Sequence, residues 1–280
     1  MQDRDDGERG VAIAVEAVRA AAEIHTHFRQ RFDPQSDDAT RAALAERADN
    51  EARAAAIGVL AAAAGGRETT VLSETALTIV GSSGELALTE PNGHARDGTW
   101  RRFCHDTFWV IDGLDGVANF RRGLPFCCAT VGYVEGGQVQ FGATYAPALG
   151  ELFSVVRGRP ALLNGCPITT SRRTEARGSM VCSGAEIRFG VRPPGLVMRN
   201  MGSHALSLAY VACGRTEGYI SMPNLPYHLG PWDCAVGTLL IEAAGGYCGG
   251  PTGGELDLWA GGIVACSSRE LADLLVGALC

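Results

Sequence analysis

The sequence predicts a mixed α/β fold, in which helices come first, a sheet follows, and strands and helices then alternate. Over 11–31 and 38–63, apolar residues recur at helical spacing with charged residues on the other face, so we expect two long amphipathic helices. From residue 69 onwards, short runs rich in Val, Ile, Thr and aromatic residues are separated by Gly, Pro and Asn. This second pattern is typical of strands joined by turns.

The middle of the chain is predicted to form a run of strands. A strand over 69–74 ends in Glu74, and 76–90 has the pattern of a hairpin that turns at Ser-Ser-Gly. The segment 91–98 is expected to be an exposed loop. Further strands are expected in 107–112, on either side of Gly136-Gly137 within 126–147, and in 150–158, with a tight turn in 163–168.

The last part of the chain alternates between strands and helices. Ser203 is expected to cap a helix over 203–214, and a helix over 231–246 has Pro at its start and Gly just past its end. The other expected elements are strands in 178–184, 216–222 and 261–268 and a closing helix over 269–279.

These elements are expected to form two parts that pack as one continuous body. Residues 1–155 supply the N-terminal helices and an antiparallel sheet, and residues 156–280 supply a C-terminal α/β part. With 46% hydrophobic and 20% charged residues, a chain of this length can bury a sizeable core.

Composition excludes several classes of function. The net charge of −7 argues against diffuse binding to nucleic acid or to an anionic membrane surface. No apolar run approaches the roughly 18 residues that span a bilayer, and the acidic N-terminus lacks an apolar signal core. The ten cysteines form no C-x-x-C pair, so we expect reduced core thiols in a cytoplasmic protein rather than a zinc cluster.

A buried strand ends in two aspartates, Asp112 and Asp115, on either side of a short turn. Gly113 and Gly116 permit sharp turns, so Asp115 can lie beside Asp112, with the Leu114 carbonyl pointing the same way. Two adjacent carboxylates stay ionised together only beside a cation, and oxygen ligands favour Mg²⁺ or Mn²⁺ over zinc. The alternative is a turn whose aspartates only cap backbone amides.

The residues after this turn, Val-Ala-Asn-Phe, are expected to begin a helical turn. Its free N–H groups would face the same pocket, and a helix start favours phosphate through both its amides and its dipole. One short segment would therefore offer metal ligands and a phosphate cradle together.

The segments D-G-L-D-G-V-A-N-F (112–120) and W-D-C-A-V-G…E-A-A-G-G (232–246) resemble the two core motifs of the inositol monophosphatase superfamily, the metal-dependent, lithium-sensitive sugar phosphatases. Ser73-Glu74-Thr75 resembles the upstream S-E-E of that family. The match follows the family's order from about residue 10 to the end. It implies a five-layer α-β-α-β-α sandwich of the inositol monophosphatase and fructose-1,6-bisphosphatase type.

The resemblance also implies a set of metal ligands. Glu74, Asp112 and the Leu114 carbonyl would hold one ion, and Asp112, Asp115 and Asp233 would hold a second. Glu74 would also face a weaker third site. The implied cofactor is Mg²⁺, two or three ions per site, with Mn²⁺ as a possible substitute.

Other matched residues acquire roles in the same way. Asp49 would lie near the attacking water and act in catalysis together with Glu74 and Asp112. The backbone amides of Gly116 and Val117 would receive the phosphate. A homodimer is the assembly that the resemblance implies, and a small phosphate monoester is the implied partner.

The substrate side of the pocket is less well matched. The segment 199–215 resembles the part of the family that lines the substrate pocket, so Ser203 and His204 are candidate substrate contacts, with a helix-surface position as the alternative for His204. His228 lies in an altered loop before Trp232 and is a candidate for shaping the leaving-group pocket. The alternative for that histidine is an ordinary exposed loop.

Three departures from the family pattern bear on activity. Val117 replaces a threonine whose hydroxyl helps to orient and deprotonate the attacking water, and Val has neither donor nor acceptor in its side chain. Thr75 replaces the second Glu of S-E-E, and Gly113 replaces a proline, which loosens the turn. All four acidic metal ligands are nevertheless present.

Two functions from different classes follow from these observations. The first is a Mg²⁺-dependent phosphomonoesterase that acts on a small polyol, sugar or nucleoside phosphate. The second is a catalytically impaired paralogue that binds metal and phosphate, or that regulates an active homologue.

Overall fold

The computed structural model describes residues 2–81, 84–89, 107–223 and 229–279. Two long helices, α1 (Gln2–Arg29) and α2 (Asp38–Ala64), open the chain as predicted, although α1 begins nine residues before the expected start at residue 11. The Asp37 carboxylate caps α2 by accepting from the Thr40 amide, and Gly65 ends it in the left-handed conformation. Both ends of α2 therefore satisfy backbone groups that a helix leaves unpaired.

The first sheet has nine strands in the order β3-β2-β1-β4-β5-β6-β7-β8-β9. Its pairs are antiparallel, except that β1 and β4 run parallel. The predicted hairpin over 76–90 is β2/β3, and the two strands predicted around Gly136-Gly137 are β5/β6. The tight turn predicted in 163–168 joins two short paired strands, β8 and β9, which were not predicted. The strands are β1 (Thr69–Ser73), β2 (Ala76–Gly81), β3 (Gly84–Thr89), β4 (Thr107–Asp115), β5 (Cys128–Glu135), β6 (Gln138–Ala146), β7 (Glu151–Val156), β8 (Leu162–Leu163) and β9 (Cys166–Pro167).

The second sheet has five strands in the order β11-β10-β12-β14-β13. Two of them, β11 (Val197–Arg199) and β13 (Tyr247–Gly249), were not predicted, because three-residue edge strands leave no periodic pattern. The others are β10 (Met180–Ser183), β12 (Gly218–Ser221) and β14 (Ile263–Cys266). The later helices are α4 (His204–Ala212), α5 (Pro231–Ala243) and α6 (Arg269–Ala278), and the one-turn α3 (Val117–Phe120) follows β4.

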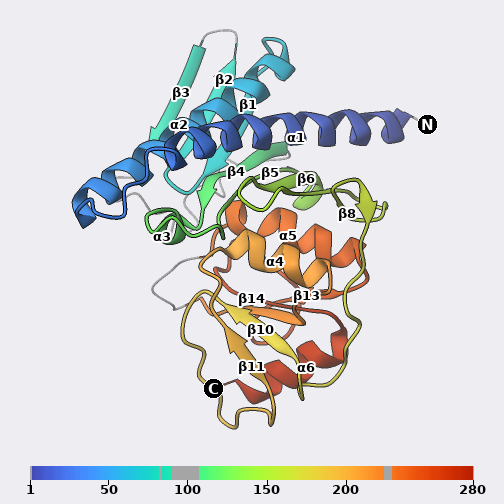
Figure 1. Ribbon diagram of the computed structural model, residues 1–280. Coiled ribbons are helices and arrows are strands. Elements are labelled where there is room, and N and C mark those ends of the chain that lie inside the picture. Colours follow the sequence, from blue (N-terminus) through green and yellow to red (C-terminus); the bar gives the residue numbers. More distant parts are fainter. Residues whose placement is uncertain (1, 82–83, 90–106, 224–228, 280) are drawn as a thin grey trace.

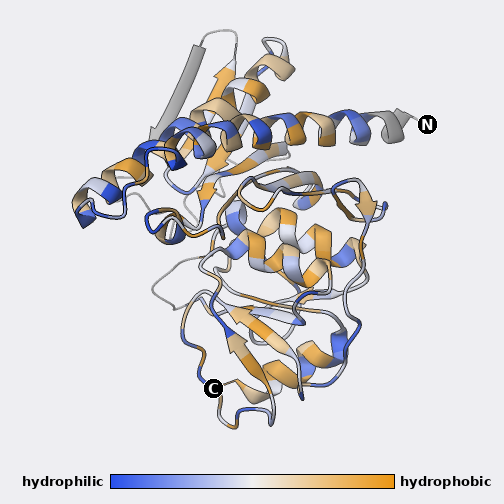
Figure 2. Cartoon of the chain, in the orientation of Figure 1, coloured by the Kyte–Doolittle hydropathy of each residue, from blue (hydrophilic) through white to orange (hydrophobic). Residues whose placement is uncertain are grey.

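These elements stack in five layers (Figure 1). α1 and α2 cover one face of the first sheet, α4 and α5 lie between the two sheets, and α6 covers the outer face of the second sheet. Figure 2 shows α4 and α5 as predominantly hydrophobic, whereas α1 alternates between hydrophilic and hydrophobic residues. A helix that is apolar all round belongs inside a protein. The five-layer sandwich that the family resemblance implied is thus confirmed.

One hydrophobic core joins the two halves of the chain. It contains Val110 and Phe153 from the first sheet, Leu206 and Leu240 from the middle helices, and Ile263 from the second sheet. The cysteines that the structure describes are all free thiols. Most are buried or partly buried, as expected for core residues, but Cys166 is exposed on β9. No helix among the described residues is long and apolar enough to cross a membrane. The division at residue 155 stays a prediction.

Candidate metal centre

Three aspartates from two distant parts of the chain converge between the first sheet and the middle helices. Asp112, Asp115 and Asp233 each offer a carboxylate oxygen, and these oxygens lie within 4.8 Å of one another. Asp115 and Asp233 are buried and Asp112 is partly buried. The two motifs that the sequence singled out therefore meet, as predicted.

An irregularity at the end of β4 brings its two aspartates together. In a regular strand, residues three apart point to opposite faces of the sheet. Here the pairing of β4 with β5 shifts register between Asp112 and Asp115, as at a β-bulge. The Leu114 amide donates to Asp112 Oδ1 over 2.9 Å, which fixes the turn. Asp112 thus also caps a backbone amide, the role that the alternative reading of this turn gave it.

Gly116 follows the turn in a conformation that requires glycine. Its φ is +94°, and a Cβ there would lie 2.7 Å from the carbonyl oxygen of Phe126. Gly116 precedes α3, and the Val117 side chain is 37% exposed at the first position of that helix. The main chain at Gly116 and Val117 therefore borders the acidic cluster, while their contact with phosphate stays a prediction.

Asp115 is held from the start of α4. The Ser203 hydroxyl donates to Asp115 Oδ2 over 2.5 Å, and the Ala205 amide donates to the same oxygen over 2.7 Å. Ser203 also accepts from the Leu206 amide, so the predicted helix cap is confirmed. Hydrogen bonds to the ionised form stabilise a carboxylate, and the positive end of α4 adds to this effect.

Asp233 is the third residue of α5 and is buried against the same cluster. Its Oδ2 accepts from the Gly230 amide over 2.8 Å, and Pro231 occupies the first turn. A carboxylate at a helix N-terminus is stabilised by the helix dipole and held in a fixed direction.

Burial and repulsion between carboxylates disfavour the ionised forms of Asp112 and Asp233. Loss of water, then the negative charge of Asp115, raises the pKa of Asp112 well above its ordinary value. The same two causes, in the same order, raise the pKa of Asp233. A divalent cation among the three oxygens would remove this repulsion, and the all-oxygen donor set suits Mg²⁺ or Mn²⁺. The residues present therefore fit the implied metal.

Glu74 and Asp49 stand at the outer edge of the cluster. Glu74 directly follows β1 and is exposed as a residue, yet loss of water around its carboxyl and the charge of Asp115 raise its pKa. Burial raises the pKa of Asp49 to about 6, Arg53 opposes this rise, and Glu74 adds to it. The charges of Glu74 and Asp49 thus interact with those of the aspartates. Neither residue belongs to the group of three carboxylates whose oxygens lie within 4.8 Å of one another.

Arg53 is a charged residue that the sequence analysis did not identify. Its Nη1 donates to Thr75 Oγ1 over 2.6 Å and lies 3.8 Å from Asp49 Oδ2. Its position four residues after Asp49 on one helix was an available signal, since residues at this spacing share a face. Arg53 brings a permanent positive charge to the acidic edge.

The predicted substrate contacts have different surroundings. Ser203 is buried and engaged with Asp115, whereas His204 Nδ1 shares a hydrogen bond with the Tyr219 hydroxyl. The imidazole of His204 therefore faces β12. His228 lies outside the described residues. The roles of all three toward a substrate stay predictions.

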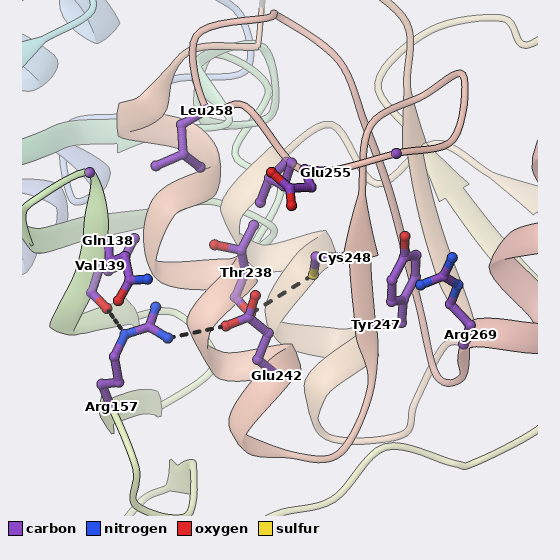
Figure 3. A pocket seen from close by; sticks show the side chains of 13 residues that line it. Gln138, Val139, Arg157, Thr238, Glu242, Tyr247, Cys248, Glu255, Leu258 and Arg269 are labelled. Atoms are coloured by element: carbon purple, nitrogen blue, oxygen red, sulfur yellow. Dashed lines mark hydrogen bonds and ion pairs between the residues drawn. The ribbon is translucent and has the colours of Figure 1, made fainter.

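A cavity of about 560 Å³ lies near the opposite end of α5 (Figure 3). Arg157 reaches across part of it to the Val139 carbonyl and to Glu242, at 2.7 and 3.7 Å. The guanidinium of Arg269 stacks on Tyr247. Because Glu242 is nine residues beyond Asp233 on the same helix, the two are about 13 Å apart along its axis. None of the predicted site residues lines this cavity.

The family model described as "Inositol monophosphatase family" matches residues 6–280. Inositol monophosphatase 3 of Solanum lycopersicum is 35% identical over 61% of this chain and 67% of its own length. Nus factor SuhB of Haemophilus influenzae is 33% identical over 61% of this chain and 66% of its own length. The matched segments thus span about two thirds of these relatives.

Solved structures share the fold over nearly the whole chain. The extragenic suppressor protein suhB from Bartonella henselae has a TM-score of 0.73 at 23% identity, covering 95% of this chain and 97% of its own. An inositol monophosphatase from Anabaena (Nostoc) has a TM-score of 0.72 at 23% identity, covering 98% and 97%. At such identities these structures establish the fold alone.

Proposed function

The chain belongs to the inositol monophosphatase family, and from this premise we propose that it is a Mg²⁺-dependent phosphatase that hydrolyses a small phosphate monoester. The observation that carries the proposal is the convergence of Asp112, Asp115 and Asp233 within 4.8 Å. Buried carboxylates at this spacing need a cation to remain ionised. Sugar, polyol and nucleoside phosphates are the substrate classes that we propose.

We assign the metal ligands to the side chains of Glu74, Asp112, Asp115 and Asp233 and to the Leu114 carbonyl. Metal ions bound there would lower the pKa of a coordinated water and stabilise the leaving oxygen. The Ala205 amide donates to Asp115 and the Gly230 amide donates to Asp233, and these hydrogen bonds fix the directions of the two carboxylates. Such pre-organisation favours metal affinity and precise geometry.

The remaining roles belong to groups around the cluster. The amides of Gly116 and Val117 would bind the phosphoryl oxygens, and Asp49, with a pKa of about 6, is suited to accept a proton from the attacking water near neutral pH. Ser203, His204 and His228 remain our candidates for the substrate side. The homodimer and the cytoplasmic location stay predictions.

A second function is favoured by one observation. Val117 stands at the edge of the cluster without the hydroxyl that the family motif carries there. A chain of this kind could bind metal and phosphate without turnover and act as a regulatory subunit. One of the relatives is itself named a Nus factor rather than a phosphatase.

The test is a phosphate-release screen over sugar, polyol and nucleoside monophosphates, with and without Mg²⁺. Release that depends on Mg²⁺ and is abolished in Asp233→Asn supports the phosphatase. Absence of release on every substrate, together with Mn²⁺ binding by calorimetry, supports the binding protein instead. Absence of Mn²⁺ binding contradicts both proposals.

A further inference from the structure

Two side chains of α1 contact the backbone at the two ends of the segment 113–123. His25 Nε2 lies 2.7 Å from the Gly113 carbonyl oxygen, and Arg29 Nη2 donates to the Gly123 carbonyl oxygen over 2.6 Å. The two residues are four apart on one helix, so their side chains share a face. The segment that they span contains Asp115, Gly116 and Val117.

The protonation of His25 follows from its surroundings. A carbonyl oxygen only accepts, so Nε2 carries the proton and donates it. His25 is 1% exposed, and burial lowers its pKa to about 4, which leaves the ring neutral at neutral pH. Its Nδ1 is buried without a hydrogen-bond partner. A leucine would fill this space but would leave the Gly113 carbonyl oxygen without this donor, so packing alone does not account for a histidine here.

The segment 113–123 has a glycine at each end, and each glycine packs closely against its neighbours. A Cβ on Gly113 would lie 2.8 Å from the Arg53 amide nitrogen and 3.0 Å from the Asp49 carbonyl oxygen in α2. Gly123, at φ +70°, lies against the Phe32 ring, which a Cβ would approach to 2.9 Å. Close approach to the main chain of α2 at Gly113 and to an aromatic ring at Gly123 allows little adjustment of the hydrogen-bonded positions.

The middle of the segment is anchored by apolar contacts. Leu114 and Phe120 are buried in one small cluster with Phe28 of α1 and Ala48 of α2. The His25 ring lies 6.0 Å from the Phe120 ring between centroids. The polar contacts at the ends and the apolar contacts between them thus fix the segment to the same two helices.

We propose that His25 and Arg29 are positioning residues, which hold the segment 113–123 in the shape that brings the carboxylates of Asp112 and Asp115 to a common cation. The proposal rests on the metal binding proposed above and adds to it the residues that set the ligand geometry. In this proposal, neither side chain contacts the oxygen atoms that would bind the metal. Their effect passes through the backbone carbonyls of Gly113 and Gly123.

The test compares His25→Leu with His25→Gln in the full-length protein. Glutamine can place an N–H donor near the position of Nε2, and leucine cannot. The readout is Mn²⁺ affinity by electron paramagnetic resonance, because outer partners of metal sites typically change affinity by about 10- to 100-fold. We expect His25→Leu to lose affinity in this range and His25→Gln to recover most of it. His27→Leu, on the exposed face of α1, is the matched control and keeps wild-type affinity.

A second variant and a second measurement keep the proposal testable if His25→Leu fails to fold. Arg29 is partly exposed at the end of α1, so Arg29→Met, which removes the donor, tests the other contact at a more tolerant position. Hydrogen exchange of the metal-free protein should accelerate across 113–123 in His25→Leu and Arg29→Met, and not in the remainder of β4. Wild-type Mn²⁺ affinity in folded His25→Leu and Arg29→Met would overturn the proposal. Failure of the wild-type protein to bind Mn²⁺ would instead overturn the proposed function.

Discussion

Ser203 donates its hydroxyl to Asp115 over 2.5 Å, although the two residues are 88 positions apart in the chain. The same hydroxyl oxygen caps α4. One side chain therefore links the strand that carries two candidate metal ligands to the helix layer between the sheets. The contact has two separable consequences, one for stability and one for metal affinity.

Ser203→Ala is expected to weaken both properties. Loss of a helix cap costs about 1 kcal/mol of stability, and loss of the bond to Asp115 should reduce Mn²⁺ affinity by about 10- to 100-fold. Ser268→Ala is the matched control, because Ser268 caps α6 by accepting from the Leu271 amide, away from the acidic cluster. Urea unfolding and Mn²⁺ titration measure the two effects. Equal Mn²⁺ affinity in both variants would show that Ser203 is only a cap.

Without metal, stability should fall as the pH rises. A carboxyl whose pKa is raised in the folded state binds its proton more tightly there than in the unfolded chain. Its stabilising contribution is complete below the unfolded pKa of about 4 and is lost as the pH rises through the folded pKa. The pKa of Asp49 is raised to about 6, and the pKa values of Asp112 and Asp233 are raised well above their ordinary value, so the loss should begin above about pH 4 and continue through pH 6.

Thermal unfolding in EDTA across this pH range, repeated with saturating Mg²⁺, checks the prediction. Mg²⁺ should oppose the loss, because a bound cation favours ionised carboxylates. Asp112→Asn should raise the melting temperature of the metal-free protein at pH 8 and remove most of the response to Mg²⁺. The asparagine keeps an oxygen for the Leu114 amide, so the turn is preserved. A metal-free melting temperature that rises from pH 5 to 8 would contradict this account.

Val117→Thr should increase turnover if the phosphatase proposal holds. Threonine has nearly the shape of valine and adds a hydroxyl at a position that is 37% exposed, so no core packing opposes it. A proton-transfer group contributes on the order of 10²–10⁴ in rate, which sets the largest gain expected in kcat. Val117→Ala removes methyl groups without adding a hydroxyl and should show no gain. An unchanged rate in Val117→Thr would mean that another group orients the water.

Arg53→Gln should raise the pKa values of Asp49 and Glu74, so that both ionise at higher pH. The Arg53 charge opposes the rise of the Asp49 pKa, so its removal should place that pKa above 6. The acid limb of the pH–rate profile would then shift upwards, while glutamine retains a donor for Thr75. Arg47→Gln, which removes an exposed arginine paired with Glu51 on the same helix, should leave the limb in place. Coincident profiles for the two variants would exclude Arg53 from this role.

Local patterns predicted most of the fold. Helical spacing located α1 and α2, and glycine turns located the hairpins, because these signals arise within a few residues of the chain. The strands β11 and β13 were missed, since each has three residues and forms only where a sheet edge is available. The layer order came from the resemblance rather than from local pattern.

The candidate site was predictable where a motif carries its own geometry. The turn from Asp112 to Asp115 and the helix start at Asp233 each place a carboxylate through short-range structure. By contrast, the contact between His25 and Gly113 joins residues 88 positions apart, and nothing near His25 in the sequence indicates it. The role of Arg53 was predictable in part. Its spacing from Asp49 on one helix can be read from the sequence, whereas its hydrogen bond to Thr75 cannot.

The bare Cα of Gly113 has a consequence for protein engineering. The family's proline cannot be restored there alone, because any ring at this position would collide with the main chain of α2. A chimera that imports only the central motif of a relative should therefore misfit. A chimera that exchanges α1, α2 and the motif together would preserve the packing between the two helices and the turn.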